Sequence, residues 1–282
     1  MFERLKRYFL RITDRRPVIH CDVTALAPNE LLKGRRALIT GGTSGIGFSI
    51  AESYLKAGAS VSITGRNKER IDSACQKLNS IGEIHGYVLD NTKVDSFETV
   101  FNKILLDNNG SIDILVNNAG VNYPGMPNVV EVEYDQVLDT NLKGVFFLSQ
   151  MIGKYMVEKG IKGNILNICS SSSLRPANSA YTVSKWGLRG LTLGLAKSLI
   201  AHGIVVNGLA PGATATPMLI KNNNSNLSYS SSPIGRYILP EEIANMAVFL
   251  VSNMGRSVVG DIVYMTGGMG LITYDDINYN VF

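Results

Sequence analysis

Short apolar runs alternate along the chain with longer stretches whose apolar positions recur every three or four residues. Each run is a nearly unbroken series of β-branched residues and leucine, which is typical of a strand buried on both faces of a parallel sheet. Strands are expected at 37–40, 61–64, 84–89, 112–116, 164–168 and 204–206. The helical spacing is clear at 67–79, with apolar residues at Ile71, Ala74, Cys75 and Leu78. The repeated order of strand and helix predicts the α/β class, a doubly wound and mostly parallel sheet with helices on both faces.

The N-terminal segment, residues 1–33, falls outside this alternation. Its apolar residues Phe2, Leu5, Phe9 and Ile12 share one helical face, with basic residues around the rest. We interpret the segment as a helix that docks on this subunit or on a neighbour. A helix on a membrane surface through residues 1–16 and a disordered or processed leader remain alternatives. Residues 34–282 then form the main domain.

A second exception is the segment 221–232, which is rich in asparagine and serine and has almost no residue suited to a core. Such a composition predicts a loop. A loop of this length within a compact domain is often a lid over a site.

Composition narrows the functional classes. The net charge is +4, and residues 1–16 carry that excess, which is too little to indicate a nucleic-acid partner. The three cysteines are far apart and lack metal or redox spacing, which favours reduced thiols and a cytoplasmic protein. No acidic or histidine cluster has metal-ligand spacing, so we expect no metal. No apolar run reaches the ~18–20 residues that span a bilayer, and no secretory signal is evident.

The first predicted strand runs directly into a glycine-rich turn that opens a helix. Glycine allows the backbone to turn sharply and to approach a pyrophosphate, while the free N–H groups of the helix face the phosphates. A glycine cluster alone is weak evidence, but this one stands in the required first strand–helix unit. The turn predicts a dinucleotide site that includes Gly41, Thr43, Ser44, Gly45, Ile46 and Gly47.

The residues after the second and third strands indicate which dinucleotide binds. An acidic residue after the second strand would favour NAD, but the chain has Gly65, Arg66 and Asn67 there. A guanidinium without a carboxylate matches an added 2′-phosphate, so the sequence favours NADP over NAD. After the third strand, Asp90 and Asn91 could bond the adenine amine, although a loop-capping aspartate is the competing interpretation.

Candidate catalytic residues follow the fifth strand. Tyr181 and Lys185 lie four residues apart on one helix face, where the ammonium would favour the phenolate. Spacing alone is not diagnostic, because Tyr155 and Lys159 share it. The difference is Ser170, which follows a buried strand at its carboxyl end, where open α/β sheets bind ligands.

Together these motifs resemble the short-chain dehydrogenase/reductase family over about residues 34–270. The resemblance rests on the glycines of the turn, Asn117–Gly120, Asn141, Ser170, Tyr181, Lys185, Pro211 and Gly212, in the family's order and approximate spacing. It implies a Rossmann-like NAD(P)-binding catalytic domain with about seven strands. It also implies homo-oligomers, tetramers or dimers, formed through long paired helices and the last strand, here 179–201 and 261–265.

The resemblance also implies a role for each matched residue. Tyr181 would be the general acid in reduction and the base in oxidation, Ser170 would polarise the substrate oxygen, and Lys185 would bind the nicotinamide ribose. Asn141 would hold a water that relays protons. Asn118, Ala119 and Gly120, together with Asn117, would flank the adenine ribose. Thr214 and Thr216, after Pro211 and Gly212, would contact the cofactor's carboxamide and phosphates.

The chain departs from the family in the loop between Ser170 and Tyr181, which is about two residues shorter than usual. Ser171 and Ser172 in this loop are alternative polarising hydroxyls, and Arg175 could bind an anionic substrate or be a solvated arginine. The expected reaction is NADP(H)-linked interconversion of a carbonyl and a secondary alcohol on a small polar or sugar-like molecule. A 3-oxoacyl-thioester reductase and a non-catalytic cofactor-binding scaffold or redox sensor are the alternatives.

Overall fold

The computed structural model describes residues 27–219 and 227–269, and its centre is a seven-stranded sheet. The strand order is β3-β2-β1-β4-β5-β6-β7, and all neighbours are parallel. The strands are β1 (Arg36–Thr40), β2 (Ser60–Gly65), β3 (Ile84–Val88), β4 (Ile114–Asn117), β5 (Asn164–Ile168), β6 (Val205–Pro211) and β7 (Ile262–Met265). The predicted α/β class and the doubly wound parallel sheet of about seven strands are therefore confirmed.

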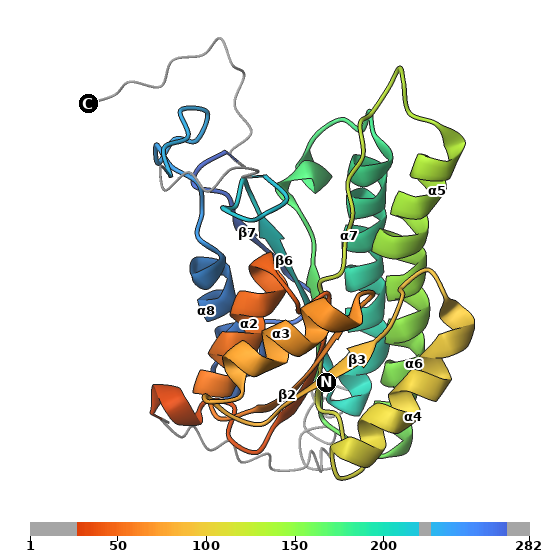
Figure 1. Ribbon diagram of the computed structural model, residues 1–282, viewed down its shortest axis with the longest axis vertical. Coiled ribbons are helices and arrows are strands. Elements are labelled where there is room, and N and C mark those ends of the chain that lie inside the picture. Colours follow the sequence, from red (N-terminus) through yellow and green to blue (C-terminus); the bar gives the residue numbers. More distant parts are fainter. Residues whose placement is uncertain (1–26, 220–226, 270–282) are drawn as a thin grey trace, which may run out of the picture.

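Helices cover both faces of this sheet (Figure 1). They are α2 (Gly45–Lys56), α3 (Lys68–Leu78), α4 (Phe97–Asp107), α5 (Glu131–Leu138), α6 (Gly144–Glu158), α7 (Ala180–Leu199) and α8 (Pro240–Val251). Figure 1 shows α2, α3 and α8 on one side and α4, α6 and α7 on the other. Shorter turns are η1 (Pro28–Glu30), η2 (Val94–Ser96), η4 (Ser171–Leu174), η5 (Ile200–His202) and η6 (Asn253–Gly255), with a π-helical turn, η3 (Asp139–Lys143).

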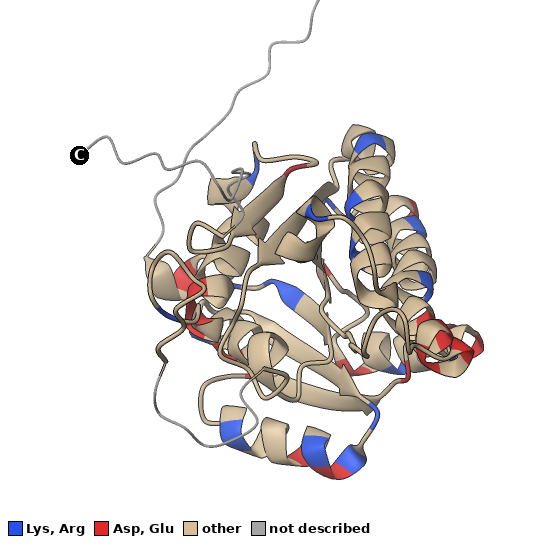
Figure 2. Ribbon diagram, turned by 90° about the horizontal axis from the view of Figure 1, so that it is seen from above, with Lys and Arg blue, Asp and Glu red and all other residues tan. Residues whose placement is uncertain are grey.

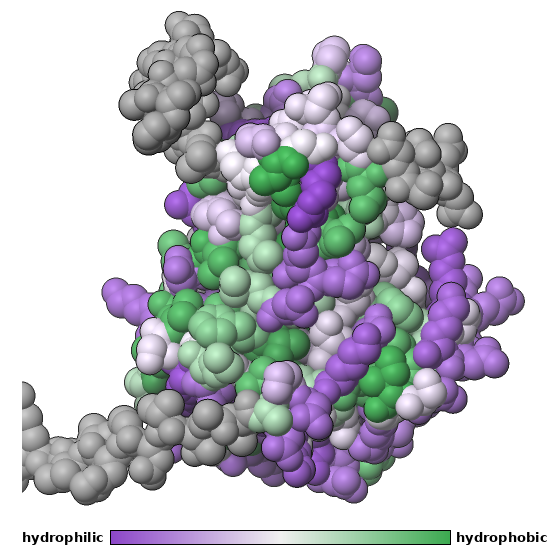
Figure 3. All heavy atoms as spheres, turned by 90° about the vertical axis from the view of Figure 1, so that its left-hand side faces the viewer, coloured by the Kyte–Doolittle hydropathy of each residue, from purple (hydrophilic) through white to green (hydrophobic). Residues whose placement is uncertain are grey.

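The two helix layers bury alternate residues of the same strands. Ile39 of β1 and Val116 of β4 belong to a core with α2 and α8, whereas their neighbours Leu38 and Leu115 belong to a core with α4 and α6. Successive strand side chains point to opposite faces, so a strand between two helix layers must be apolar at nearly every position. The outer surface on the α8 side carries polar and apolar side chains interspersed (Figure 3).

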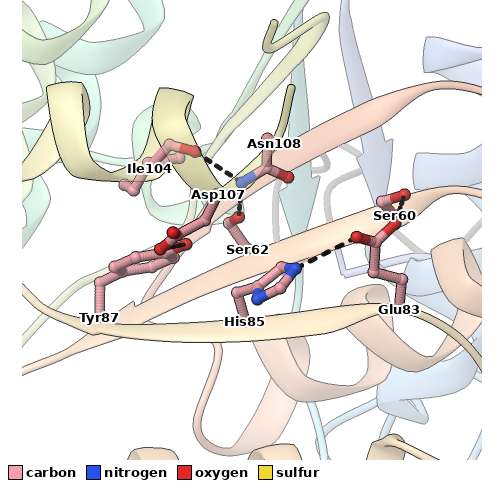
Figure 4. A network of polar contacts seen from close by, with 8 residues as sticks. All are labelled: Ser60, Ser62, Glu83, His85, Tyr87, Ile104, Asp107 and Asn108. Carbon is pink, nitrogen blue, oxygen red and sulfur yellow. Dashed lines mark hydrogen bonds and ion pairs between the residues drawn. The ribbon is translucent and has the colours of Figure 1, made fainter. Parts of the chain in front are cut away.

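A polar network ties the edge strand β3 and helix α4 to β2 (Figure 4). Asn108 donates to the Ser62 hydroxyl at 3.0 Å and to the carbonyl of Ile104 at 2.7 Å. The Tyr87 hydroxyl donates to Asp107 at 2.8 Å. The pKa of Tyr87 is raised, mainly by burial and secondly by the neighbouring Asp107 carboxylate. These bonds fix the strand that leads into Asp90.

The described part of the N-terminal segment packs on the domain. Leu32 is fully buried in the core, and its backbone N–H donates to the carbonyl of Ala57 at 2.8 Å. The amphipathic pattern at 1–16 and most of the predicted loop 221–232 lie outside the described residues. Within the described residues, no helix has both the length and the apolar character required to cross a membrane.

The sheet order places β1 between β2 and β4. The connection after β1 runs to β2 on one side, whereas the connection after β3 crosses to β4 on the other side. Loops after adjacent strands therefore diverge at the carboxyl end of β1. In open α/β sheets the crevice at such a switch point is where ligands bind. The glycine-rich turn follows β1 at this point.

Candidate functional site

The glycine-rich turn has a backbone that side chains would not permit. Gly41 and Gly45 have φ angles of +66° and +56°, in the left-handed region. A Cβ on Gly41 would lie 2.9 Å from the α-carbon of Ala119, and one on Gly47 would lie 2.5 Å from the carbonyl oxygen of Gly41. The turn is thus packed closely against the β4 loop, and α2 begins at Gly45 with Ser44 before it.

Asn118 holds this turn in place. Its side-chain amide donates to the carbonyl oxygens of Thr40 at 2.9 Å and Gly41 at 3.0 Å. The Thr40 hydroxyl in turn accepts from the backbone N–H groups of Asn118 and Ala119 at 3.0 and 3.1 Å. These hydrogen bonds join the ends of β1 and β4, a bracing role that the sequence did not reveal.

A single cleft of about 1050 Å³ runs along the carboxyl ends of the strands and brings most of the predicted residues together. Its lining includes Gly41, Thr43, Ser44, Gly45, Ile46, Arg66, Asp90, Asn91, Asn118, Ala119, Gly120, Ser170, Tyr181, Lys185, Pro211, Gly212, Thr214 and Thr216. Three predicted residues, Gly47, Asn117 and Asn141, do not line it and are buried behind it. The side-chain amide of Asn117 donates to Ser149 at 2.9 Å and to Asn167 at 2.8 Å. Figure 2 views the molecule from above, and most of its charged residues lie on the surrounding helices.

Two arginines stand at the glycine-turn end of the cleft. Arg66 follows β2 and is exposed, as the sequence predicts. Arg70 also lines the cleft. It lies in the first turn of α3, where the cap residue Asn67 accepts from the backbone N–H of Arg70 at 2.9 Å. Sequence reasoning missed Arg70, although residues four apart in a helix share one face and could have drawn attention to it.

The loop after β3 is shaped by its own side chains. Asp90 accepts from both the backbone N–H and the hydroxyl of Thr92 at 3.0 Å through one carboxylate oxygen. Asn91 is 4% exposed, and its side-chain nitrogen has no hydrogen-bond partner among the described residues. Asp90 therefore has the loop-capping role that was the alternative to adenine binding. Its other carboxylate oxygen forms no hydrogen bond with any described residue and could still accept from an adenine amine.

Ser170 begins η4 at the end of β5. Its hydroxyl oxygen accepts from the backbone N–H of Ser172 at 3.1 Å, which leaves the hydroxyl hydrogen to be donated elsewhere. Ser173 donates its own hydroxyl to the carbonyl of Ser170 at 2.7 Å. Ser171 and Ser172, the alternative hydroxyls, also line the cleft.

Tyr181 and Lys185 occupy the first turns of α7. The helix is capped by Ser179, whose hydroxyl oxygen accepts from the backbone N–H of Thr182 at 3.2 Å. Lys185 is 5% exposed, and its ammonium donates to the carbonyl of Ile168 at 2.7 Å. The same nitrogen lies 5.6 Å from the centre of the Tyr181 ring. A buried ammonium is thereby held beside the phenol by the last residue of β5.

Asn141 lies inside the π-helical turn η3 and is fully buried. Its side-chain oxygen accepts from the backbone N–H of Val121 at 2.8 Å, and its nitrogen donates to the carbonyl of Val121 at 2.9 Å and to Ser184 at 3.2 Å. The side chain thus joins α7 to the loop after β4.

Other side chains close to the catalytic candidates make contacts within the chain. Thr214 donates to the carbonyl of Gly212 at 3.0 Å, and a Cβ on Gly45 would lie 3.3 Å from the Thr216 methyl. Cys169 is buried, and burial raises the pKa of its thiol, which keeps it protonated. Among the described residues, no group of three histidine, cysteine, aspartate or glutamate side chains could hold a metal ion.

Part of the cleft has an apolar rim drawn from three loops. Met126 and Met218 are 73% and 51% exposed, and Leu219 is 50% exposed. Met269 and Tyr229 complete the rim, and Tyr229 stacks on Tyr237 with ring centres 4.5 Å apart. A substrate that reaches this rim would meet flexible apolar side chains.

Comparisons with known proteins agree with this geometry. A model of the family described as short chain dehydrogenase matches residues 35–227. A 3-oxoacyl-[acyl-carrier-protein] reductase of Thermotoga maritima is 35% identical over 244 residues, covering 84% of this chain and 98% of the relative. A gluconate 5-dehydrogenase of Gluconobacter oxydans is 36% identical over 246 residues, covering 84% and 95%. The solved structure of a short chain dehydrogenase from Burkholderia cenocepacia in complex with NADP has a TM-score of 0.77 at 30% identity, covering 84% and 98%.

Proposed function

This chain belongs to the short-chain dehydrogenase/reductase family of oxidoreductases, and we propose that it uses NADP(H) to interconvert a ketone and a secondary alcohol. The observation that carries the proposal is the meeting of Ser170, Tyr181 and Lys185 on one wall of the cleft that also contains the glycine turn. A single cleft can therefore hold a dinucleotide and a carbonyl side by side.

The chemistry of this wall suits proton transfer to a substrate oxygen. A bound nicotinamide dinucleotide would supply the hydride to a carbonyl or accept it from an alcohol. Tyr181 would donate its phenolic proton in reduction and take the alcohol proton in oxidation. Ser170 would donate its hydrogen to the same oxygen, since its own oxygen already accepts from Ser172. Lys185 uses one of its three donors on Ile168, which leaves two for a ribose and the ammonium charge for a developing phenolate.

The cofactor proposal is NADP rather than NAD. The glycine turn is packed too closely against the loop after β4 to carry side chains, and α2 begins there with N–H groups that could face a pyrophosphate. Arg66 and Arg70 both line that end of the cleft, and Asp90 is the only carboxylate among its described lining residues. Two guanidinium groups favour the 2′-phosphate, and the NADP complex of the Burkholderia structure supports the choice.

For the substrate we propose a small polar or sugar-like carbonyl, with support from the gluconate 5-dehydrogenase relative. A second candidate is a 3-oxoacyl thioester. The exposed apolar rim of Met126, Met218 and Leu219 favours it, because such side chains could cover an acyl chain, and the Thermotoga relative is a reductase of that kind.

We also propose that the chain forms a homo-oligomer. Phe146 and Phe147 of α6 are 45% and 39% exposed, and Val183 and Leu193 of α7 are 40% and 47% exposed. Of these two helices only α7 was expected to pair with a second subunit, and apolar exposure of this kind is common at interfaces between subunits. Light scattering of the purified protein would give the mass in solution, and a monomer at micromolar concentration would contradict this proposal.

The test of the proposed function is a panel of ketones and secondary alcohols assayed with NADPH or NADP⁺ and with NADH or NAD⁺ in parallel. Turnover is expected with at least one ketone, with NADPH preferred and with Tyr181→Phe inactive. Arg66→Gln and Arg70→Gln should each raise the KM for NADPH while leaving that for NADH unchanged. A wild-type preference for NADH, or an unchanged KM for NADPH in both variants, would contradict the role given to the arginines.

A further inference from the structure

Arg175 lies in the loop that connects Ser170 to Tyr181, the two residues proposed to contact the reacting oxygen. It follows η4, five residues after Ser170 and six before Tyr181, and all three line the cleft. The 3₁₀ turn between Ser170 and Arg175 rises about 2 Å per residue and each flanking step spans at most about 3.8 Å, so the α-carbon of Arg175 lies within about 14 Å of that of Ser170. Its long side chain can therefore reach a substrate held at Ser170 without movement of the loop.

The backbone of Arg175 is fixed to the helix that carries Tyr181 and Lys185. The indole N–H of Trp186 donates to the carbonyl of Arg175 at 2.8 Å, and the N–H of Arg175 donates to the carbonyl of Ser172 at 3.1 Å. Arg189 lies 5.5 Å from the Trp186 ring centre and reaches the carbonyl of Ser173 at 3.4 Å. The position of Arg175 relative to the catalytic pair is thus set by α7.

The guanidinium of Arg175 has no such ties. It is exposed and makes no hydrogen bond or ion pair with any residue in the described parts of the chain. Arg236 shows the contrast, since its guanidinium forms two bonds of 2.8 and 2.9 Å with Glu242. A fixed backbone with a free guanidinium is the arrangement expected of a residue that binds something other than its own chain.

The charge around Arg175 favours an anion as the bound group. Asp90 is the only carboxylate among the described residues that line the cleft. It follows β3, which is four strand spacings from β5 in the sheet order, or about 19 Å. That distance is roughly twice the screening length at physiological salt, so Asp90 does not neutralise Arg175. The buried ammonium of Lys185 adds positive charge at the same end.

We propose that Arg175 binds an anionic oxygen group on the substrate, either a carboxylate or a phosphate. The planar guanidinium fork matches two oxygens of such a group at once. The substrate would then be a keto acid, a hydroxy acid or a sugar phosphate rather than a neutral carbonyl compound. This inference rests on the proposed function, because it assigns the substrate class of the same cleft.

Matched substrates test the assignment in the full-length enzyme with NADPH. 5-Keto-D-gluconate and D-fructose 6-phosphate carry the two candidate anions, and D-fructose is the neutral reference. 5-Oxohexanoate and hexan-2-one form a second, less polar pair. The enzyme variants are Arg175→Gln, Arg175→Lys and, as a control that removes one exposed charge outside the cleft, Lys103→Gln. Binding is measured independently by titrating the fluorescence of enzyme-bound NADPH.

The expected result is that kcat/KM for one anionic substrate falls roughly 10- to 100-fold in Arg175→Gln, mainly through KM. Arg175→Lys should restore part of the loss, and Lys103→Gln and the neutral ketones should show no change. The substrate that is affected distinguishes carboxylate from phosphate. If anions show no preference, or if a preference persists in Arg175→Gln, the assignment is wrong. If NADPH reduces none of the ketones, the proposed function fails separately, and the fluorescence titration still decides whether Arg175 binds an anion.

Discussion

The chain contains the same tyrosine-and-lysine pattern twice, at Tyr155 and Lys159 near the end of α6 and at Tyr181 and Lys185 at the start of α7. The two helices lie side by side in Figure 1, but the patterns are at opposite ends of the sheet. Tyr155 donates its hydroxyl to the carbonyl of Gly110 at 2.7 Å, in the loop that enters β4. Tyr181 lines the cleft beyond the carboxyl ends of the strands.

The lysines differ even more than the tyrosines. Lys159 is exposed at the C-terminal cap of α6, whereas Lys185 is buried and bonded to the carbonyl of Ile168. Tyr155 packs edge-on against Phe101, with ring centres 5.2 Å apart, and serves as a core residue with one satisfied hydroxyl. The comparison teaches that four-residue spacing only makes a shared helix face; strand topology decides whether that face reaches a cleft.

The largest expected effect is that of removing the Tyr181 hydroxyl. Tyr181→Phe should lower kcat/KM by roughly 10² to 10⁴-fold, because it removes the proton donor. The free energy of unfolding should change by less than about 0.5 kcal/mol, since that hydroxyl makes no hydrogen bond with any described residue. Steady-state kinetics and urea unfolding of the same preparation measure both quantities. An active variant would show that the two tyrosines do not differ in function.

The lysines sharpen the same contrast. Lys185→Met should lower kcat/KM by roughly 10²-fold, because the ammonium that stabilises a developing phenolate is lost. Lys159→Met removes an identical charge from an exposed position and should leave kcat/KM unchanged. The pair of variants is compared in one assay across pH 6 to 10. Equal losses would indicate that overall charge, and not position, matters.

Tyr155→Phe should reverse the pattern seen at Tyr181. It should leave kcat/KM unchanged and lower the free energy of unfolding by about 1 kcal/mol, because the carbonyl of Gly110 loses its donor. In thermal unfolding this corresponds to a fall in Tm of roughly 2–4 °C. A loss of activity at full stability would overturn the structural role of Tyr155.

The smallest effect concerns alkaline pH. Burial raises the pKa of Tyr155 above its ordinary value in the folded protein. A tyrosine with a raised folded pKa contributes stability that is fully present below its unfolded pKa, about 10, and that is lost as pH rises through the folded value. Wild type should therefore lose slightly more stability than Tyr155→Phe between pH 9 and 11 in urea unfolding. Parallel curves would mean that Tyr155 titrates as an exposed phenol.

Local sequence signals predicted much of this molecule. Apolar runs located six of the seven strands, because a sheet between two helix layers demands them. The last strand, β7, was expected only from the family resemblance, and β6 extends to Pro211 through residues that interrupt the run. The glycine turn could be recognised because its backbone angles exclude other residues. Contacts between loops distant in sequence could not be predicted. The bracing amide of Asn118, the apolar rim and the bond from Trp186 to Arg175 depend on how separate loops meet above the sheet.

The central position of β1 also has a consequence for how the chain folds. Ala37 pairs with Val61 on one side and with Ile114 on the other, so one neighbour of β1 is close in sequence and the second is far away. During synthesis at about 5–20 residues per second, β4 would follow β1 by roughly 4–15 seconds. Until then the β1 edge that will join β4 is unpaired, and closing that long loop is a slow step for a parallel sheet. The junction that forms the cofactor crevice is thus also the point at which nascent chains are most exposed to mispairing.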